Sequence, residues 1–131
     1  MELLSSRSAA HFFRKIIGSA DVEEFWVIAL NPLCKVIKSD MLFRGTVDTC
    51  FVHPRDVFRF ALLANATSII VGHNHPSGEC EPSRADKELT TRLKQGGDLL
   101  QIPLVDHVVI TYKGYFSFAE SSWNVQKRLV R

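Results

Sequence analysis

The sequence predicts a single α/β domain, because segments with helical spacing alternate with short apolar runs that are typical of buried strands. The chain has 131 residues, of which 46% are hydrophobic and 23% are charged. This length suits one domain of residues 1–131, and the balance is ordinary for a globular protein. No run approaches the roughly 18 apolar residues of a membrane span. The first ten residues lack the apolar core of a signal peptide.

The three cysteines, Cys34, Cys50 and Cys80, include no C-x-x-C pair. An odd and sparse set of this kind suits a reducing compartment and argues against a disulfide framework. We therefore expect a cytoplasmic protein that does not associate with membranes.

The N-terminal part of the chain predicts one helix followed by strands. Residues 5–17 place apolar side chains on one stripe at helical spacing. Residues 24–30 form an apolar run that predicts a buried strand. Residues 36–37 and 42–43 suggest two further strands, with a turn at residues 39–40 between them.

The middle of the chain predicts a helix and then a buried strand. Residues 52–66 have a helical pattern, with Pro54 suited to the first helical position. Residues 67–72 are apolar and rich in β-branched side chains, which predicts a strand. A third helix begins at Ser83 and continues at least to Lys94. It either ends at the glycines of residues 96–97 or continues to Leu100.

The C-terminal part predicts a strand over residues 102–110 and a hairpin turn at residues 113–114. The second strand of that hairpin covers residues 115–118. Residues 121–131 form a basic tail that suggests a short helix and a contact with a partner chain. A homo-oligomer is one form that such a contact would take.

The main chemical signal lies between the strand at 67–72 and the third helix. It reads His73-x-His75, then Ser83 and Asp86. Side chains two residues apart on a strand share a face, so the two imidazoles can converge on one ion. Asp86 falls in the first turn of the following helix and can supply a carboxylate oxygen. Two histidines, one carboxylate and a water describe a catalytic zinc site.

A simpler interpretation also fits part of this pattern. Ser83-x-x-Asp86 alone is a capping box, in which Ser83 is the N-cap and Asp86 lies near the third helical position. The two roles are compatible. A histidine pair alone is weak support for a metal site, whereas the complete spacing between a strand and a helix is more specific.

The spacing His73-x-His75-x7-Ser83-x2-Asp86 resembles the metalloprotease motif of JAB/MPN (JAMM) domains. The residues around it resemble the RadC family of bacterial proteins, and the segments 43–46, 53–56, 64–66 and 106–107 also fit that family. The resemblance implies a cytidine-deaminase-like α/β fold, with a mixed sheet flanked by about three helices. It further implies Zn2+ held by His73, His75 and Asp86, and metallopeptidase or isopeptidase activity. RadC proteins also carry a DNA-repair label.

The family pattern implies a catalytic glutamate at the start of the strand that follows the first helix. Glu24 matches that pattern best, and Glu23 is the alternate, facing the other way. The glutamate would take a proton from the attacking water and pass it to the leaving group. The same pattern gives Ser83 a hydrogen bond to the oxyanion of the tetrahedral intermediate.

Asp106 and His107 are polar residues inside an apolar strand, so both require partners. Asp106 either orients one of the ligand histidines from behind or accepts hydrogen bonds from loop amides. His107 faces the opposite side of the strand, and we interpret it as structural.

Three functions compete on this basis. The first is a zinc-dependent hydrolase acting on a peptide or protein, although two imidazoles and one carboxylate also suit iron or manganese. The second, a zinc nucleobase deaminase, requires H-x-E and P-C-x-x-C motifs that the sequence lacks. The third is a non-catalytic metal-binding module of a DNA-repair protein. A net charge of +2 and the lack of a basic stripe give nucleic-acid binding no support. The helix-hairpin-helix region that often precedes this domain in RadC proteins is also not present.

Overall fold

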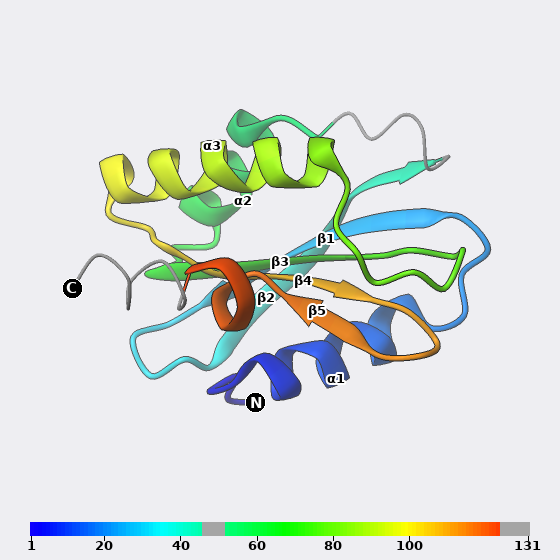
Figure 1. The fold of residues 1–131 in the computed structure, drawn as a ribbon. Coiled ribbons are helices and arrows are strands. Elements are labelled where there is room, and N and C mark those ends of the chain that lie inside the picture. The colour runs from blue at the N-terminus through cyan, green and yellow to red at the C-terminus, as the bar shows by residue number, and fades with distance from the viewer. Residues whose placement is uncertain (46–51, 124–131) are drawn as a thin grey trace.

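The computed structural model describes residues 1–45 and 52–123. Its core is a five-stranded mixed sheet with the strand order β2-β1-β3-β4-β5, in which β3 and β4 are parallel and the other neighbours antiparallel. Helix α1 covers one face, and α2 and α3 cover the other (Figure 1). The elements are α1 (Ser6–Ile17), β1 (Glu23–Leu30), β2 (Val36–Gly45), α2 (Pro54–Leu63), β3 (Ser68–Asn74), α3 (Arg84–Leu100), β4 (Leu104–Ile110), β5 (Tyr115–Ser117) and the π-helical turn η1 (Ala119–Trp123). The predicted mixed α/β fold is confirmed.

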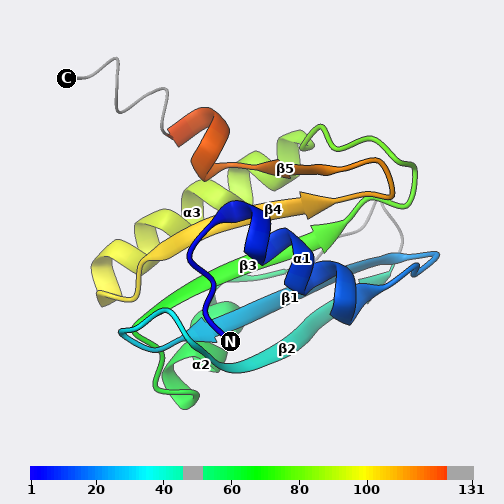
Figure 2. The same ribbon diagram turned by 90° about the horizontal axis from the view of Figure 1, so that it is seen from below.

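Both faces of the central strands β1, β3 and β4 are buried, and the alternation of side chains along these strands divides them into two cores. Phe25 and Val27 point to the face covered by α2 and α3. Trp26 and Ile28 point to the face covered by α1, which lies across the middle of the sheet in Figure 2. Neighbouring residues in β1, β3 and β4 therefore lie in different chemical environments. This division decides which polar side chains meet.

Most predicted elements are present, with shifted ends. Ser5 is the N-cap of α1, and Pro54 occupies the start of α2. Helix α3 continues to Leu100, the second of the two predicted ends. Gly97 allows this helix to pack against the following loop, because a Cβ atom there would lie 2.6 Å from the carbonyl oxygen of Ile102. No helix in residues 1–45 and 52–123 is long and apolar enough to cross a membrane.

The prediction of two short strands with a turn at residues 39–40 was wrong. Strand β2 is continuous from Val36 to Gly45 and pairs with β1 along its whole length. It lies at the edge of the sheet and is largely exposed, so its polar residues point into solvent while the backbone continues the ladder. Cys50 and residues 124–131 of the predicted tail lie outside the described residues.

Candidate metal centre

The carboxyl end of β3 brings the two histidines of the motif together. The Nε2 atoms of His73 and His75 lie 3.0 Å apart. Asn74, between them, points to the α1 face, as the strand alternation predicts. Its side chain accepts a hydrogen bond from the backbone N–H of Glu24 and donates one to the carbonyl of Val22. These two bonds fix the end of β3 against the start of β1.

The start of α3 supplies the carboxylate. Ser83 is the N-cap, and its hydroxyl accepts a hydrogen bond from the backbone N–H of Asp86 at 3.1 Å. In return, Oδ2 of Asp86 accepts one from the N–H of Ser83 at 2.8 Å. The predicted capping box is therefore present. It holds the carboxylate with one oxygen 3.3 Å from Nε2 of His73 and the other 3.3 Å from Nε2 of His75.

The structure places Glu23, and not Glu24, beside these groups. Glu23 is only 2% exposed, and its carboxylate lies 3.8 Å from Nε2 of His73. Glu24 faces away, where it accepts a hydrogen bond from the indole of Trp26 and pairs with Arg44. The expected position of Glu24 at the metal site was thus wrong. The physical reason is the register of the sheet: Phe25 pairs with His73, so Glu23 shares their face.

Burial and mutual attraction oppose each other in the electrostatics of the cluster. Burial raises the pKa of Glu23, although His73 and His75 partly offset this effect. Burial also acts to raise the pKa of Asp86, but the imidazoles of His73 and His75, 3.3 Å from its oxygens, outweigh this effect and hold that pKa well below the usual range. For His75, burial acts to lower the pKa, while Asp86 and the carbonyl of Glu79 raise it overall.

The donor atoms fit a metal ion in both chemistry and spacing. One candidate ligand atom from each of Glu23, His73, His75 and Asp86 lies within 4.8 Å of the others. Nδ1 of His75 lies 2.8 Å from the carbonyl oxygen of Glu79, which can only accept, so Nε2 of the neutral ring carries the lone pair. Donors bound at about 2.0–2.1 Å by a tetrahedral ion lie about 3.3 Å apart. The two Nε2 atoms lie 3.0 Å apart, and each lies 3.3 Å from a different oxygen of Asp86, so all three spacings are close to this value.

Asp106 does not orient a ligand histidine. Its Oδ1 accepts hydrogen bonds from the backbone N–H groups of His107 and Ala119. Its Oδ2 accepts from the hydroxyls of Ser6 and Ser117. The expectation that it acts behind the metal site was wrong, and its alternative role of accepting from backbone amides is correct. Burial raises its pKa, although these hydrogen bonds partly offset the effect.

The residue that contacts the back of His73 is His107, with 2.9 Å between Nε2 of His107 and Nδ1 of His73. Its own Nδ1 lies 2.6 Å from the hydroxyl of Thr90 in α3. The sequence predicts a structural role for His107 and assigns no role to Thr90. One feature of the sequence could have identified Thr90. It follows Asp86 by four residues, so the two residues lie on the same side of α3.

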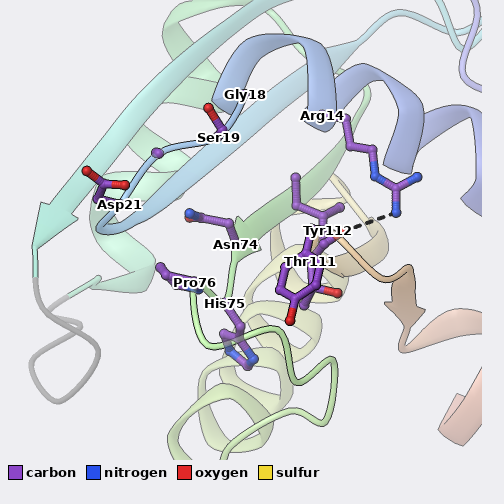
Figure 3. Close-up of a pocket in the computed structure, with 11 residues that line it drawn as sticks. Arg14, Gly18, Ser19, Asp21, Asn74, His75, Pro76, Thr111 and Tyr112 are labelled. Carbon is purple, nitrogen blue, oxygen red and sulfur yellow. Dashed lines mark hydrogen bonds between the residues drawn. The ribbon is translucent and has the colours of Figure 1, made fainter.

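A pocket of about 530 Å3 lies beside the centre, at the carboxyl ends of the parallel strands β3 and β4. Figure 3 shows it between the end of α1 and the chain that follows β4, with Arg14 reaching toward Thr111. The guanidinium of Arg14 donates to the carbonyl of Thr111 at 3.3 Å. His75 and Pro76 line the side of the pocket that adjoins the metal site.

Comparison with known proteins agrees with this geometry. The RadC-like JAB domain family matches residues 3–123. A UPF0758 protein of Thermotoga maritima is 52% identical over 94 residues, which are 72% of this chain and 42% of that protein. A UPF0758 protein of Xylella fastidiosa is 46% identical over 116 residues, or 88% of this chain and 52% of that protein. The chain thus spans about half the length of these curated relatives. With this match and with the motif residues gathered at one end of the sheet, the chain belongs to the RadC-like JAB domain family.

Proposed function

We propose that this domain is a metal-dependent hydrolase that cleaves amide bonds in peptides or proteins, with zinc as its metal. His73, His75 and Asp86 would hold the ion. When bound, zinc polarises a carbonyl and lowers the pKa of water to about 7. The observation that carries the proposal is the position of Glu23. It is buried beside the three ligands, yet its 3.8 Å separation from His73 exceeds the spacings among them.

Glu23 is suited to move protons in this reaction. Burial raises its pKa, which brings the carboxyl closer to the pH at which it must both accept and release a proton. It would take the proton of the attacking water and deliver it to the leaving amine. No other acidic side chain occupies this side of β1, because Glu24 lies on the opposite face.

Ser83 is suited to bind the carbonyl oxygen of the substrate. Its hydroxyl accepts the hydrogen bond from Asp86, an arrangement that leaves its own proton for donation. The helix N-terminus already holds this donor in place. Little reorganisation energy is therefore needed when negative charge develops on that oxygen. The pocket beside His75 offers space for the part of the substrate next to the cleaved bond.

A second candidate is a metal-binding module without catalysis, in a protein associated with DNA repair. It is favoured by the fact that Glu23 is one of the four candidate donors within 4.8 Å. If Glu23 completes the coordination, the site is closed and structural, and water has no place on the metal.

The test compares Glu23→Gln with Glu24→Gln, which makes the same change on the opposite face of β1. Both variants and the parent are loaded with zinc, their metal content is measured, and fluorogenic peptides and lysine-linked isopeptides are offered as substrates. We expect Glu23→Gln to retain zinc and to lose about 10²–10⁴-fold in hydrolysis rate, the usual contribution of a proton carrier. Glu24→Gln should keep both zinc and activity.

Loss of zinc in Glu23→Gln would identify Glu23 as a ligand and favour the closed module. Equal hydrolysis by the parent and Glu23→Gln would show that the glutamate has no role in the reaction. If zinc-loaded parent protein cleaves none of the substrates while Glu23→Gln retains its metal, the hydrolase proposal fails for these substrate classes.

A further inference from the structure

Thr90 and His107 form a hydrogen-bonded chain behind His73. The Thr90 hydroxyl lies 2.7 Å from the backbone carbonyl oxygen of Asp86 and 2.6 Å from Nδ1 of His107. Nε2 of His107 lies 2.9 Å from Nδ1 of His73. Thr90 is 2% exposed and both histidines are fully buried. The chain therefore runs, shielded from water, from one proposed ligand residue to another.

The direction of each hydrogen bond in this chain can be assigned by starting from the carbonyl oxygen of Asp86. The carbonyl of Asp86 can only accept, so the single hydroxyl proton of Thr90 is donated to it. Thr90 must then accept from His107, whose Nδ1 carries a proton. His107 packs between the rings of Phe25 and Phe118, an apolar setting that favours the neutral imidazole. Nε2 of a neutral His107 is an acceptor, so Nδ1 of His73 is the donor.

We infer that Thr90 and His107 are positioning residues that hold His73 in the tautomer with its proton on Nδ1 and its lone pair on Nε2. That lone pair points to the same place as Nε2 of His75 and the carboxylate of Asp86. The inference rests on the proposed function only in taking Nε2 of His73 as the metal-binding atom. Because the chain starts at the backbone of Asp86, it also couples the position of α3 to the ring orientation on β3.

The adjacent residue offers a matched control. Thr91 donates its hydroxyl to the carbonyl of Lys87 at 3.1 Å, the same bond one residue along the helix, but on the exposed side. Thr91→Val therefore reproduces the loss of a hydroxyl and the change in helix propensity, but it leaves the hydrogen bonds of Thr90 and His107 in place. Thr90→Ser keeps the hydroxyl and tests whether the bond, and not the side-chain shape, matters.

The first experiment reads the tautomer in metal-free protein by long-range ¹H–¹⁵N NMR, at a pH where His73 and His107 are neutral. We expect protons on Nδ1 of both rings in the parent, in Thr91→Val and in Thr90→Ser. In Thr90→Val, a fraction of His73 should move its proton to Nε2. A proton on Nε2 of His73 in the parent would overturn the inference, and this result requires no variant to fold.

The second experiment measures zinc affinity by competition with a chromogenic chelator. Residues that orient metal-binding histidines typically contribute 10–100-fold in affinity. Thr90→Val should lose an amount in this range, while Thr90→Ser and Thr91→Val stay near the parent. Equal affinities and tautomers in Thr90→Val and Thr91→Val would overturn the inference. Neither measurement uses hydrolysis, so the outcome is separate from the failure of the proposed reaction.

Discussion

Two buried aspartates lie on opposite faces of the same sheet and have different surroundings. Asp106, 3% exposed, receives hydrogen bonds from two backbone N–H groups and two hydroxyls, at 2.6–3.0 Å. Asp86, 6% exposed, receives one backbone N–H bond and otherwise faces the nitrogens of His73 and His75. One carboxylate is fully surrounded by donors, whereas the other faces two imidazole nitrogens that could bind a metal ion together with it.

This difference shows that burial of an acid does not by itself identify a functional site. Asp106 connects α1, β4 and the segment from β5 to η1 through donors that the fold supplies, so its environment is complete without a ligand. At Asp86, the lone pair on Nε2 of His75 and the carboxylate oxygens point toward one another. Only a cation or a proton between them can offset their electrostatic repulsion. We therefore expect substitution of Asp86 to remove the stabilisation by zinc, and substitution of Asp106 to lower the stability of the metal-free protein.

The largest effect is expected for Asp86→Ala, measured as the stabilisation of the fold by zinc. A ligand at a free concentration of about 1,000 times its Kd stabilises the native state by about 4 kcal/mol. The parent should show a corresponding rise in Tm with zinc, and Asp86→Ala should show none. Glu88→Ala removes an exposed acid from the same helix and serves as the control, with the full rise retained. A zinc-induced rise in Asp86→Ala equal to that of the parent would remove Asp86 from the ligand set.

Asp106→Ala should produce the converse result. Removing this acceptor leaves two backbone N–H groups without their partner and takes one acceptor from the hydroxyls of Ser6 and Ser117, which can still bond to each other. We expect this to cost about 3 kcal/mol of unfolding free energy. Chemical denaturation of the metal-free protein measures this loss. The rise in Tm on adding zinc should remain, since Asp106 does not face the candidate metal site. If the variant unfolds as the parent does but no longer responds to zinc, the comparison between the two aspartates is wrong.

The sequence was sufficient to predict the fold class, the order of most elements and the convergence of His73, His75 and Asp86. These features depend on local spacing: two residues along a strand, and the first turn of a helix. The capping box at Ser83 is equally local, and it is present in the structure.

The predictions that placed Glu24 at the metal site and Asp106 behind it were wrong for the same physical reason. Glu23 and Glu24 are neighbours on β1, and Asp106 and His107 are neighbours on β4, so each choice depends on which face of the sheet is which. On an exposed strand, apolar alternation would answer that question. Here both faces are covered by helices and both are apolar, so the alternation carries no information about the face. Only the pairing of β1 and β4 with β3 determines it.

A smaller effect concerns the charge of Asp106. Burial raises its pKa above the ordinary value of 3.8 in the folded state. Its contribution therefore favours the folded state at pH values below 3.8 and is lost as the pH rises through the raised folded value. Asp106→Asn cannot ionise, keeps an oxygen for the two backbone N–H groups, and can donate to the oxygens of Ser6 and Ser117.

The stability of Asp106→Asn relative to the parent should therefore improve between pH 4 and neutral pH. The measurement is urea denaturation of both metal-free proteins across that range, with the difference in unfolding free energy plotted against pH, since distant groups titrate alike in the two proteins and cancel. A difference that moves the other way would mean that the four hydrogen bonds outweigh burial. The Asp106 carboxylate would then stabilise the fold through its charge, as Asp86 does through its imidazole partners.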